Sequence, residues 1–338
     1  MYQTLKTLLP AVPSISGREK PIRDLLCDLM RPFVDEISTD AMGNLICRRK
    51  GRATAPRKVL LCAHMDEIGF LTTFIEECGM IRVAPMGGVS YLAASYAQVV
   101  FENGTKGVLV PDGDHVSGEV PKPEKCVIDI GAASKKEAER RVRVGDCCAL
   151  VPHTTRLSAH RVCGRPLDDR IGCACLVKIA KHFAECIDPP ADDVYYVFSV
   201  QEEVGSRGAR PAAFGIAPDL ALNFDVTGAG DIPGAKSVTV KLGGGAAVKI
   251  RDSSVICHTG LVEELLRTAK REKIPAQCEI KIRGGTDTSA VQMAGAGCRA
   301  GALSIPCRYV HTGAELLDLR DAEAAVSLAV AYLEGKRV

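Results

Sequence analysis

Two adjacent glutamates, Glu202 and Glu203, follow directly on an apolar run at residues 194–200. Such runs are typical of buried strands, and sites in α/β sheets form at the carboxyl ends of those strands. Neighbouring side chains in a strand point to opposite faces, so both glutamates can serve one site only where the strand ends and bends. Two adjacent carboxylates would then suit a division of labour, with one holding a metal ion and the other moving a proton. Taken alone, the pair would more often be part of a solvated loop.

His64 and Asp66 close a second apolar run, at 58–63. Because they are two residues apart at a strand terminus, both side chains would project to the same side. A carboxylate placed there can orient the imidazole and raise its basicity, a common arrangement behind metal-binding histidines. A lone His-x-Asp is weak evidence, and taken alone it would more often have an ordinary structural role.

Two adjacent aspartates, Asp168 and Asp169, precede an apolar helical stretch. An aspartate at a helix start is ordinarily a cap, favoured by the free backbone N–H groups and the helix dipole. One cap would use one aspartate and leave the other free for chemistry. Two further apolar runs also end on residues able to bind a metal: 220–225 on Asp225, and 302–310 on His311.

These residues share a position, because each follows a predicted strand or opens a predicted helix. In a central mainly parallel or mixed sheet flanked by helices, the carboxyl ends of the strands lie along one edge. Histidines and carboxylates gathered there make a mixed nitrogen and oxygen site of the type suited to Zn²⁺, Co²⁺ or Mn²⁺. The number of groups exceeds the need of one four-coordinate ion and suits two ions that share a carboxylate. The set is His64, Asp168, Glu202, Glu203, Asp225 and His311.

The composition excludes several other classes of function. The 338 residues include 43 Lys plus Arg and 41 Asp plus Glu, so the net charge is +2. That balance favours neither nucleic acid nor an anionic membrane as partner. We expect no signal peptide and no membrane span, and hence a cytoplasmic protein. The 15 cysteines lack the CxxC spacing of a zinc ribbon, so we expect reduced thiols packed as small hydrophobic residues.

The sequence pattern changes between residues 70 and 161, where short runs typical of β-strands alternate with turn residues. This alternation predicts a β-rich domain, 70–161, inserted into an α/β domain made of 1–69 plus 162–338. Within the α/β part, residues 16–19 have the spacing of a capping box that opens a helix. Residues 284–288 are expected to form a turn.

Several of these segments together resemble the M42 metallo-aminopeptidase family, which includes the tetrahedral (TET) aminopeptidases. The resemblance covers nearly the whole chain, in order. The segments are AHMDEIGF at 63–70, LDDR at 167–170, QEEVG at 201–205, NFD at 223–225, GGTD at 284–287 and IPCRYVH at 305–311.

The resemblance implies a Zn-peptidase-like fold with a PDZ-like dimerisation insert, and six dimers that assemble into a dodecamer. It implies an aminopeptidase that removes N-terminal residues from short peptides with two divalent ions, Zn²⁺ or Co²⁺, with Mn²⁺ as a further candidate. The implied roles, by residue, are His64 and Asp225 on one ion, Glu203 and His311 on the other, Asp168 bridging both with Asp169 as its neighbour, Glu202 as general base and Asp66 behind His64.

Two other readings remain beside the aminopeptidase. An M20-type deacylase or dipeptidase would share the metal chemistry, but its insert should alternate strands and helices in a ferredoxin-like lid. A non-enzymatic scaffold held together by metals would need no base at Glu202. A cellulase activity has no support, because the chain has no Trp and few aromatic residues to bind a sugar. The loop at 241–247 departs from the family pattern, so the preferred N-terminal residue is left open.

Overall fold

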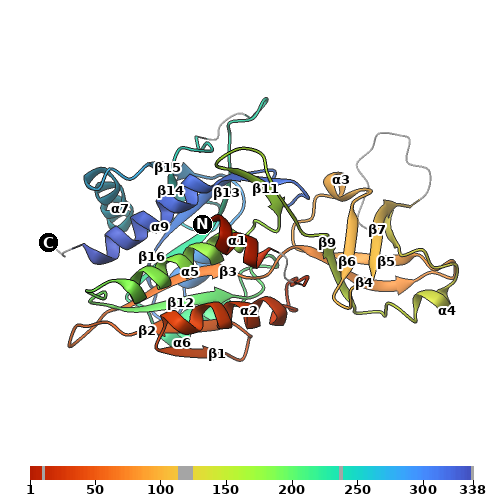
Figure 1. Cartoon of the computed structure of the whole chain (residues 1–338), viewed down its shortest axis with the longest axis horizontal. Helices are drawn as coiled ribbons and strands as arrows, with labels where there is room; N and C mark the ends of the chain where they lie inside the picture. The colour runs from red at the N-terminus through yellow and green to blue at the C-terminus, as the bar shows by residue number, and fades with distance from the viewer. Residues whose placement is uncertain (10–11, 113–124, 236–238, 336–338) are drawn as a thin grey trace.

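The computed structural model describes residues 1–9, 12–112, 125–235 and 239–335. The described chain forms an 11-stranded sheet with helices on its faces and a separate closed barrel of six strands (Figure 1). The expectation of a mixed α/β fold with a β-rich insert is therefore confirmed at this level. Every helix in the described ranges is too short or too polar to cross a lipid bilayer.

Four parallel strands form the centre of the large sheet, in the order β12 (Asp193–Ser199), β3 (Lys58–His64), β13 (Leu220–Gly228) and β16 (Arg299–Arg308). Because they run in the same direction, their carboxyl ends meet at one edge of the sheet. Antiparallel pairings extend the sheet on both sides, which makes it mixed. The flanking strands are β1 (Glu36–Thr39), β2 (Leu45–Arg49), β17 (Glu315–Asp318), β11 (Arg161–Arg165), β10 (His153–Arg156), β14 (Ala246–Arg251) and β15 (Ala276–Ile280).

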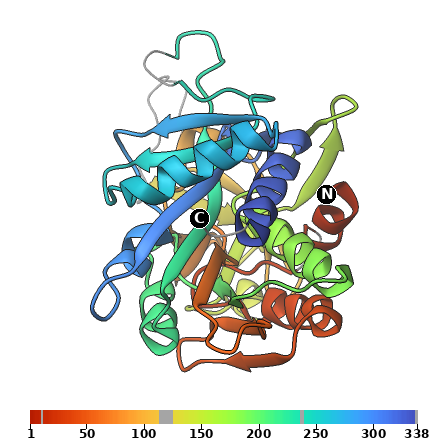
Figure 2. The ribbon, with the colours of Figure 1, turned by 90° about the vertical axis from the view of Figure 1, so that its left-hand side faces the viewer.

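Helices bury both faces of the sheet, as Figure 2 shows. On β3, Leu61 belongs to one hydrophobic cluster and Cys62 to the cluster on the opposite face. A strand covered on both sides needs no polar residues, which explains the unbroken apolar runs of the sequence. One face carries α1 (Tyr2–Leu8), α2 (Lys20–Met30), α5 (Arg170–Glu185), α7 (Thr259–Arg271) and α9 (Leu319–Glu334). The other carries α6 (Ala209–Ile216) and α8 (Asp287–Gln292).

The barrel projects from one end of the sheet and has its own apolar core, which includes Phe70, Phe101 and Leu150 (Figure 1). Its strands are β4 (Gly69–Ile75), β5 (Ile81–Met86), β6 (Gln98–Phe101), β7 (Lys106–Pro111), β8 (Cys126–Asp129) and β9 (Cys147–Leu150), with the short helices α3 (Tyr91–Ala94) and α4 (Lys135–Ala138). The next strand, β10, lies within the range predicted for the insert but pairs with β11 of the large sheet. The division into two domains stays a prediction.

Three local expectations were wrong. The capping box does not form, because the Ser16 hydroxyl donates to Asp66 at 2.6 Å and α2 begins without a side-chain cap. Strand β13 does not end on Asp225 but pairs with β16 as far as Gly228. The expected turn at 284–288 is partly helical, since α8 begins at Asp287.

Candidate metal centre

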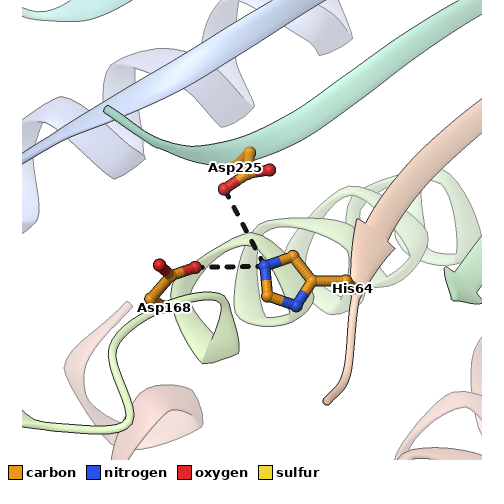
Figure 3. A group of neighbouring side chains, drawn as sticks. All are labelled: His64, Asp168 and Asp225. Atoms are coloured by element: carbon orange, nitrogen blue, oxygen red, sulfur yellow. Dashed lines mark hydrogen bonds and ion pairs between the residues drawn. The ribbon is translucent and has the colours of Figure 1, made fainter. Parts of the chain in front are cut away.

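His64, the last residue of β3, faces two carboxylates from other elements (Figure 3). Its Nε2 lies 3.0 Å from Asp168 Oδ1 and 3.9 Å from Asp225 Oδ1. Asp168 stands before α5, and Asp225 lies within β13. All three side chains are buried, so this is an enclosed group of one imidazole and two carboxylates.

A second group uses the other oxygen of the same aspartate. His311 Nε2 lies 3.2 Å from Asp168 Oδ2 and 3.1 Å from Glu203 Oε2. In each of the two groups, the candidate ligand atoms all lie within 4.8 Å of one another. The structure therefore places five predicted ligands in two sets of three that share Asp168.

The adjacent aspartates divide their roles as the sequence suggested. Asp169 is the N-cap of α5, and its carboxylate accepts a hydrogen bond from the backbone N–H of Gly172 at 2.9 Å. Asp168 is left free to face both histidines. The sequence alone does not show which aspartate caps the helix and which is free. This geometry shows that Asp169 is the cap and Asp168 is free.

The adjacent glutamates lie beyond the end of β12, where the chain bends. Gln201 has a positive φ of 57°, so the strand direction is lost before Glu202. The Asp66 carboxylate accepts hydrogen bonds from the backbone N–H of Glu202 at 3.0 Å and of Glu203 at 3.2 Å. Asp66 therefore holds the turn that brings both glutamates to the same site.

Both histidines are oriented by a backbone carbonyl. His64 Nδ1 lies 3.1 Å from the carbonyl oxygen of Asp66, and His311 Nδ1 lies 3.1 Å from that of Gly88. A carbonyl can only accept, so each Nδ1 carries a proton and donates it, and each Nε2 faces the carboxylates. The Asp66 carboxylate lies behind His64 at 3.5 Å, which is farther than the carbonyl of the same residue.

The electrostatics of the cluster favour positive charge at its centre. Burial disfavours a charged ring, yet Asp168 and Glu203 raise the pKa of His311 to about 11. Burial likewise opposes protonation of His64, but Asp168 and Asp66 raise its pKa well above the usual value. Against the effect of burial, the two histidines lower the pKa of Asp168. Protons on the imidazoles supply here the positive charge that this set of carboxylates stabilises.

The donor set is consistent with divalent metal ions. It combines imidazole nitrogen with carboxylate oxygen, which are ligands of Zn²⁺, Co²⁺ and Mn²⁺. In addition, Glu203 Oε1 is buried and has no hydrogen-bond partner among the described residues. A buried, unpaired carboxylate oxygen is costly, and a bound cation would satisfy it. The residues present therefore fit two metal sites.

Glu202 belongs to neither group of three, although it is adjacent to Glu203. Its Oε1 accepts a hydrogen bond from the Ser206 hydroxyl at 3.2 Å. Burial, opposed by His64 and reinforced by Asp225, raises the pKa of Glu202 well above its ordinary value. A carboxylate with a raised pKa that holds no ligand position is suited to take up a proton and return it.

Sequence reasoning missed two carboxylates that support this site. Glu315 accepts hydrogen bonds from the backbone N–H groups of Asp168 and His311, both at 3.2 Å. Asp287 is buried and accepts a hydrogen bond from the hydroxyl of Ser199, the last residue of β12. Glu315 had no signal in the sequence, whereas Asp287 lies in the GGTD segment, to which no role was given.

The family profile and the sequence relatives point to aminopeptidases. The sequence profile described as M42 glutamyl aminopeptidase matches residues 43–328. A putative aminopeptidase from Acetivibrio thermocellus is 40% identical over 330 residues, covering 98% of this chain and 97% of its own. A lysyl aminopeptidase from Pyrococcus furiosus is 35% identical, covering 98% of this chain and 96% of its own.

Solved structures agree with the sequence relatives. An aminopeptidase from the archaeon Desulfurococcus kamchatkensis superposes with a TM-score of 0.93 at 38% identity, over 98% of this chain and 94% of its own. The TET1 peptidase of Pyrococcus horikoshii has a TM-score of 0.86 at 33% identity over 98% of both chains, and is described as able to assemble into a tetrahedron or a large octahedral shell. A further TET1 structure, with a TM-score of 0.88 and 33% identity over 98% of both chains, is described as a dodecamer.

Proposed function

Because the chain belongs to the M42 glutamyl aminopeptidase family, we infer that it uses two metal ions to remove N-terminal residues from short peptides. Membership makes it a metal-dependent aminopeptidase, a hydrolase of peptide bonds. One observation carries the proposal of two ions: Asp168 offers one oxygen to each of two ligand groups. Enzymes that use two neighbouring metal ions include aminopeptidases.

We assign the ligands by proximity. His64 and Asp225 would hold one ion, Glu203 and His311 the other, and Asp168 would bridge them. The nitrogen and oxygen donors suit Zn²⁺ or Co²⁺, and Mn²⁺ is a further candidate. When bound, the two cations supply Lewis acidity toward the peptide carbonyl and the attacking water.

Glu202 would move the protons of the reaction. A water that attacks the peptide carbonyl must lose a proton, and the amine released when the C–N bond breaks must gain one. Glu202 can perform both transfers as general base and then general acid, because it lies beside Glu203 and has a raised pKa. Asp66 supports this role by fixing the backbone N–H of Glu202.

The structure favours this reading over its rivals. The M20-type lid is not favoured, because the inserted strands close into a barrel and the relatives are named aminopeptidases. A metal-bound scaffold would not need Glu202, a half-buried carboxylate that belongs to neither ligand group.

The finer features of the fold and assembly are also proposals. We propose that residues 1–69 plus 162–338 form a Zn-peptidase-like catalytic domain, and that residues 70–161 form a PDZ-like domain through which subunits pair. Such dimers would build a homo-oligomer in the cytoplasm, with a dodecamer as the expected form. The assemblies described for the TET1 relatives support this proposal.

The test is hydrolysis of a panel of aminoacyl-p-nitroanilides carrying Glu, Asp, Leu, Lys and Ala. The protein is first treated with a chelator and then given Co²⁺ or Zn²⁺. Cleavage that is lost on chelation and restored by metal would support the proposal and would identify the preferred N-terminal residue. Cleavage of N-acyl substrates without cleavage of any p-nitroanilide would favour the deacylase. If neither class of substrate were cleaved, the metals would have a structural role only.

A further inference from the structure

A loop of the barrel reaches the metal centre of the large sheet. It connects β5 to α3 and contains Gly87 and Gly88. The backbone N–H of Val89 donates to the carbonyl of Gly87 at 3.0 Å, which closes a tight turn around Gly88. The carbonyl of Gly88 is then free to accept a hydrogen bond from outside the loop.

That hydrogen bond comes from a candidate metal ligand 223 residues away in the sequence. His311 Nδ1 donates to the Gly88 carbonyl at 3.1 Å, and among the described residues this is the acceptor found for that N–H. The opposite nitrogen, Nε2, faces Asp168 and Glu203. The Gly88 carbonyl therefore fixes both the tautomer and the direction of the ring.

The approach is close enough to require glycine. A Cβ on Gly88 would lie 2.9 Å from His311 Nδ1 and 3.2 Å from Cε1, which is too close for either atom to stay in place. Gly87 has a positive φ of 82°, and a Cβ there would lie 2.6 Å from Ile68 Cγ2 and 3.1 Å from Glu203 Cβ. The two glycines thus allow the loop to contact both outer members of one ligand group.

In the other ligand group, the described residues show the histidine oriented from outside the barrel. The Nδ1 of His64 donates to the carbonyl of Asp66, which lies two residues along the same segment of chain. One histidine is therefore oriented from within the large sheet, and the other from the barrel loop.

We propose that Gly88 is a positioning residue through which the barrel sets the metal affinity of one site only, the site formed by Asp168, Glu203 and His311. The inference rests on the proposed two-metal function. It requires that displacement of the loop weakens the binding of one ion and leaves unchanged the binding of the ion held by His64 and Asp225.

The experiment is a stepwise titration of chelated protein with Co²⁺, followed by visible absorption and calorimetry. Wild type should bind two ions per subunit. In Gly88→Ala, we expect one binding step to weaken by about 10–100-fold, the usual effect of losing a partner that orients a ligand. The other step should be unchanged. The matched control is Gly215→Ala in α6, where an added Cβ has no neighbour within 4 Å.

A second variant separates the lost contact from the added bulk. Insertion of one glycine between Gly88 and Val89 lets the carbonyl move away without a Cβ, and the same single step should weaken. In a His64→Ala background, which should leave only the His311 step, Gly88→Ala should weaken that remaining step.

The outcomes distinguish the inference from the proposed function. If wild type bound two ions and both variants kept both affinities, or lost both equally, the role of Gly88 would be refuted while the two-metal site would stand. If wild type bound fewer than two ions, the proposed site itself would fail. Urea unfolding of the metal-free variants shows whether each one is folded before its titration is interpreted.

Discussion

The carboxylate of Glu315 accepts a hydrogen bond from the backbone N–H of His311 at 3.2 Å. Its second oxygen accepts from the N–H of Leu167 at 2.6 Å and of Asp168 at 3.2 Å. One buried carboxylate, contributed by the first residue of β17, therefore fixes the backbone at two proposed ligands. These ligands come from separate parts of the chain, so their relative position depends on Glu315.

We expect Glu315→Gln to weaken metal binding. The amide keeps the shape of the side chain but has only one acceptor oxygen, so at least one backbone N–H loses its partner. An unpaired buried donor costs about 1–3 kcal/mol. Metal affinity should fall by about 10-fold or more, as for other groups that orient ligands. Competition with a chelator measures the affinity, and Glu139→Gln on the exposed surface is the matched control; equal affinities in the two variants would contradict the role of Glu315.

We expect Glu202→Gln to separate metal binding from catalysis. The glutamine cannot take a proton, so kcat should fall by roughly 10²–10⁴, the usual contribution of general acid–base catalysis. Glu202 lies outside both ligand groups, so the metal content should stay at the wild-type level. The measurements are metal analysis and steady-state kinetics on the best p-nitroanilide. Near-full activity would rule out Glu202 as the base.

The strands and the proposed ligands could be predicted because they leave a local signal. The central strands are rich in apolar residues and covered on both faces. His64 ends one of them, and Glu202 follows another within three residues. The Asp168–Asp169 pair could be interpreted for the same reason, since a helix start needs only one cap. Where a functional residue directly follows a strand or opens a helix, the sequence indicates both the strand or helix and the residue.

The supporting contacts could not be predicted because they join distant segments. The hydroxyl of Ser16 has the spacing of a local cap, yet it donates to Asp66, 50 residues away. Gly88 looks like any turn glycine until the fold places it against His311. Strand β13 passes beyond Asp225 because β16 offers pairing partners as far as Cys307. Such tertiary contacts override the local preference for a cap, a turn or a strand end, and a single sequence does not reveal them.

We expect Lys249→Met to destabilise the fold strongly. The buried ammonium lies 2.9 Å from Asp252 and 3.3 Å from Glu279, both of which are also buried. Burial alone would lower the pKa of Lys249, but the two carboxylates outweigh it and raise the pKa, so the lysine stays charged. Removing one partner of a buried ion pair costs about 3–5 kcal/mol, because the remaining charges lose their compensation.

Urea unfolding of the metal-free protein measures this effect. The exposed Lys136→Met is the control and should change the free energy of unfolding little. The triple variant Lys249→Met/Asp252→Asn/Glu279→Gln should recover part of the loss, because no unpaired charge remains. A single variant as stable as wild type would show that the buried pair contributes nothing net.

We expect Asp318→Asn to lose a stabilising contribution that depends on pH. Asp318 caps α9, and its carboxylate accepts hydrogen bonds from the Arg320 guanidinium at 2.7 and 2.9 Å. Burial would raise the pKa of Asp318, but these contacts outweigh it and lower the pKa. A lowered folded pKa means that the stabilisation is present above the unfolded pKa of about 3.9 and is lost as the pH falls through the folded value.

Asn caps a helix as well as Asp, so the substitution removes mainly the charge. Because Arg320 is exposed, the difference from wild type should be about 0.5–1 kcal/mol at neutral pH. It should shrink below about pH 4 and in high salt. Urea unfolding of the metal-free proteins across this range tests it, with the exposed Asp28→Asn as control; a difference that grew on acidification would have the wrong sign for this ion pair.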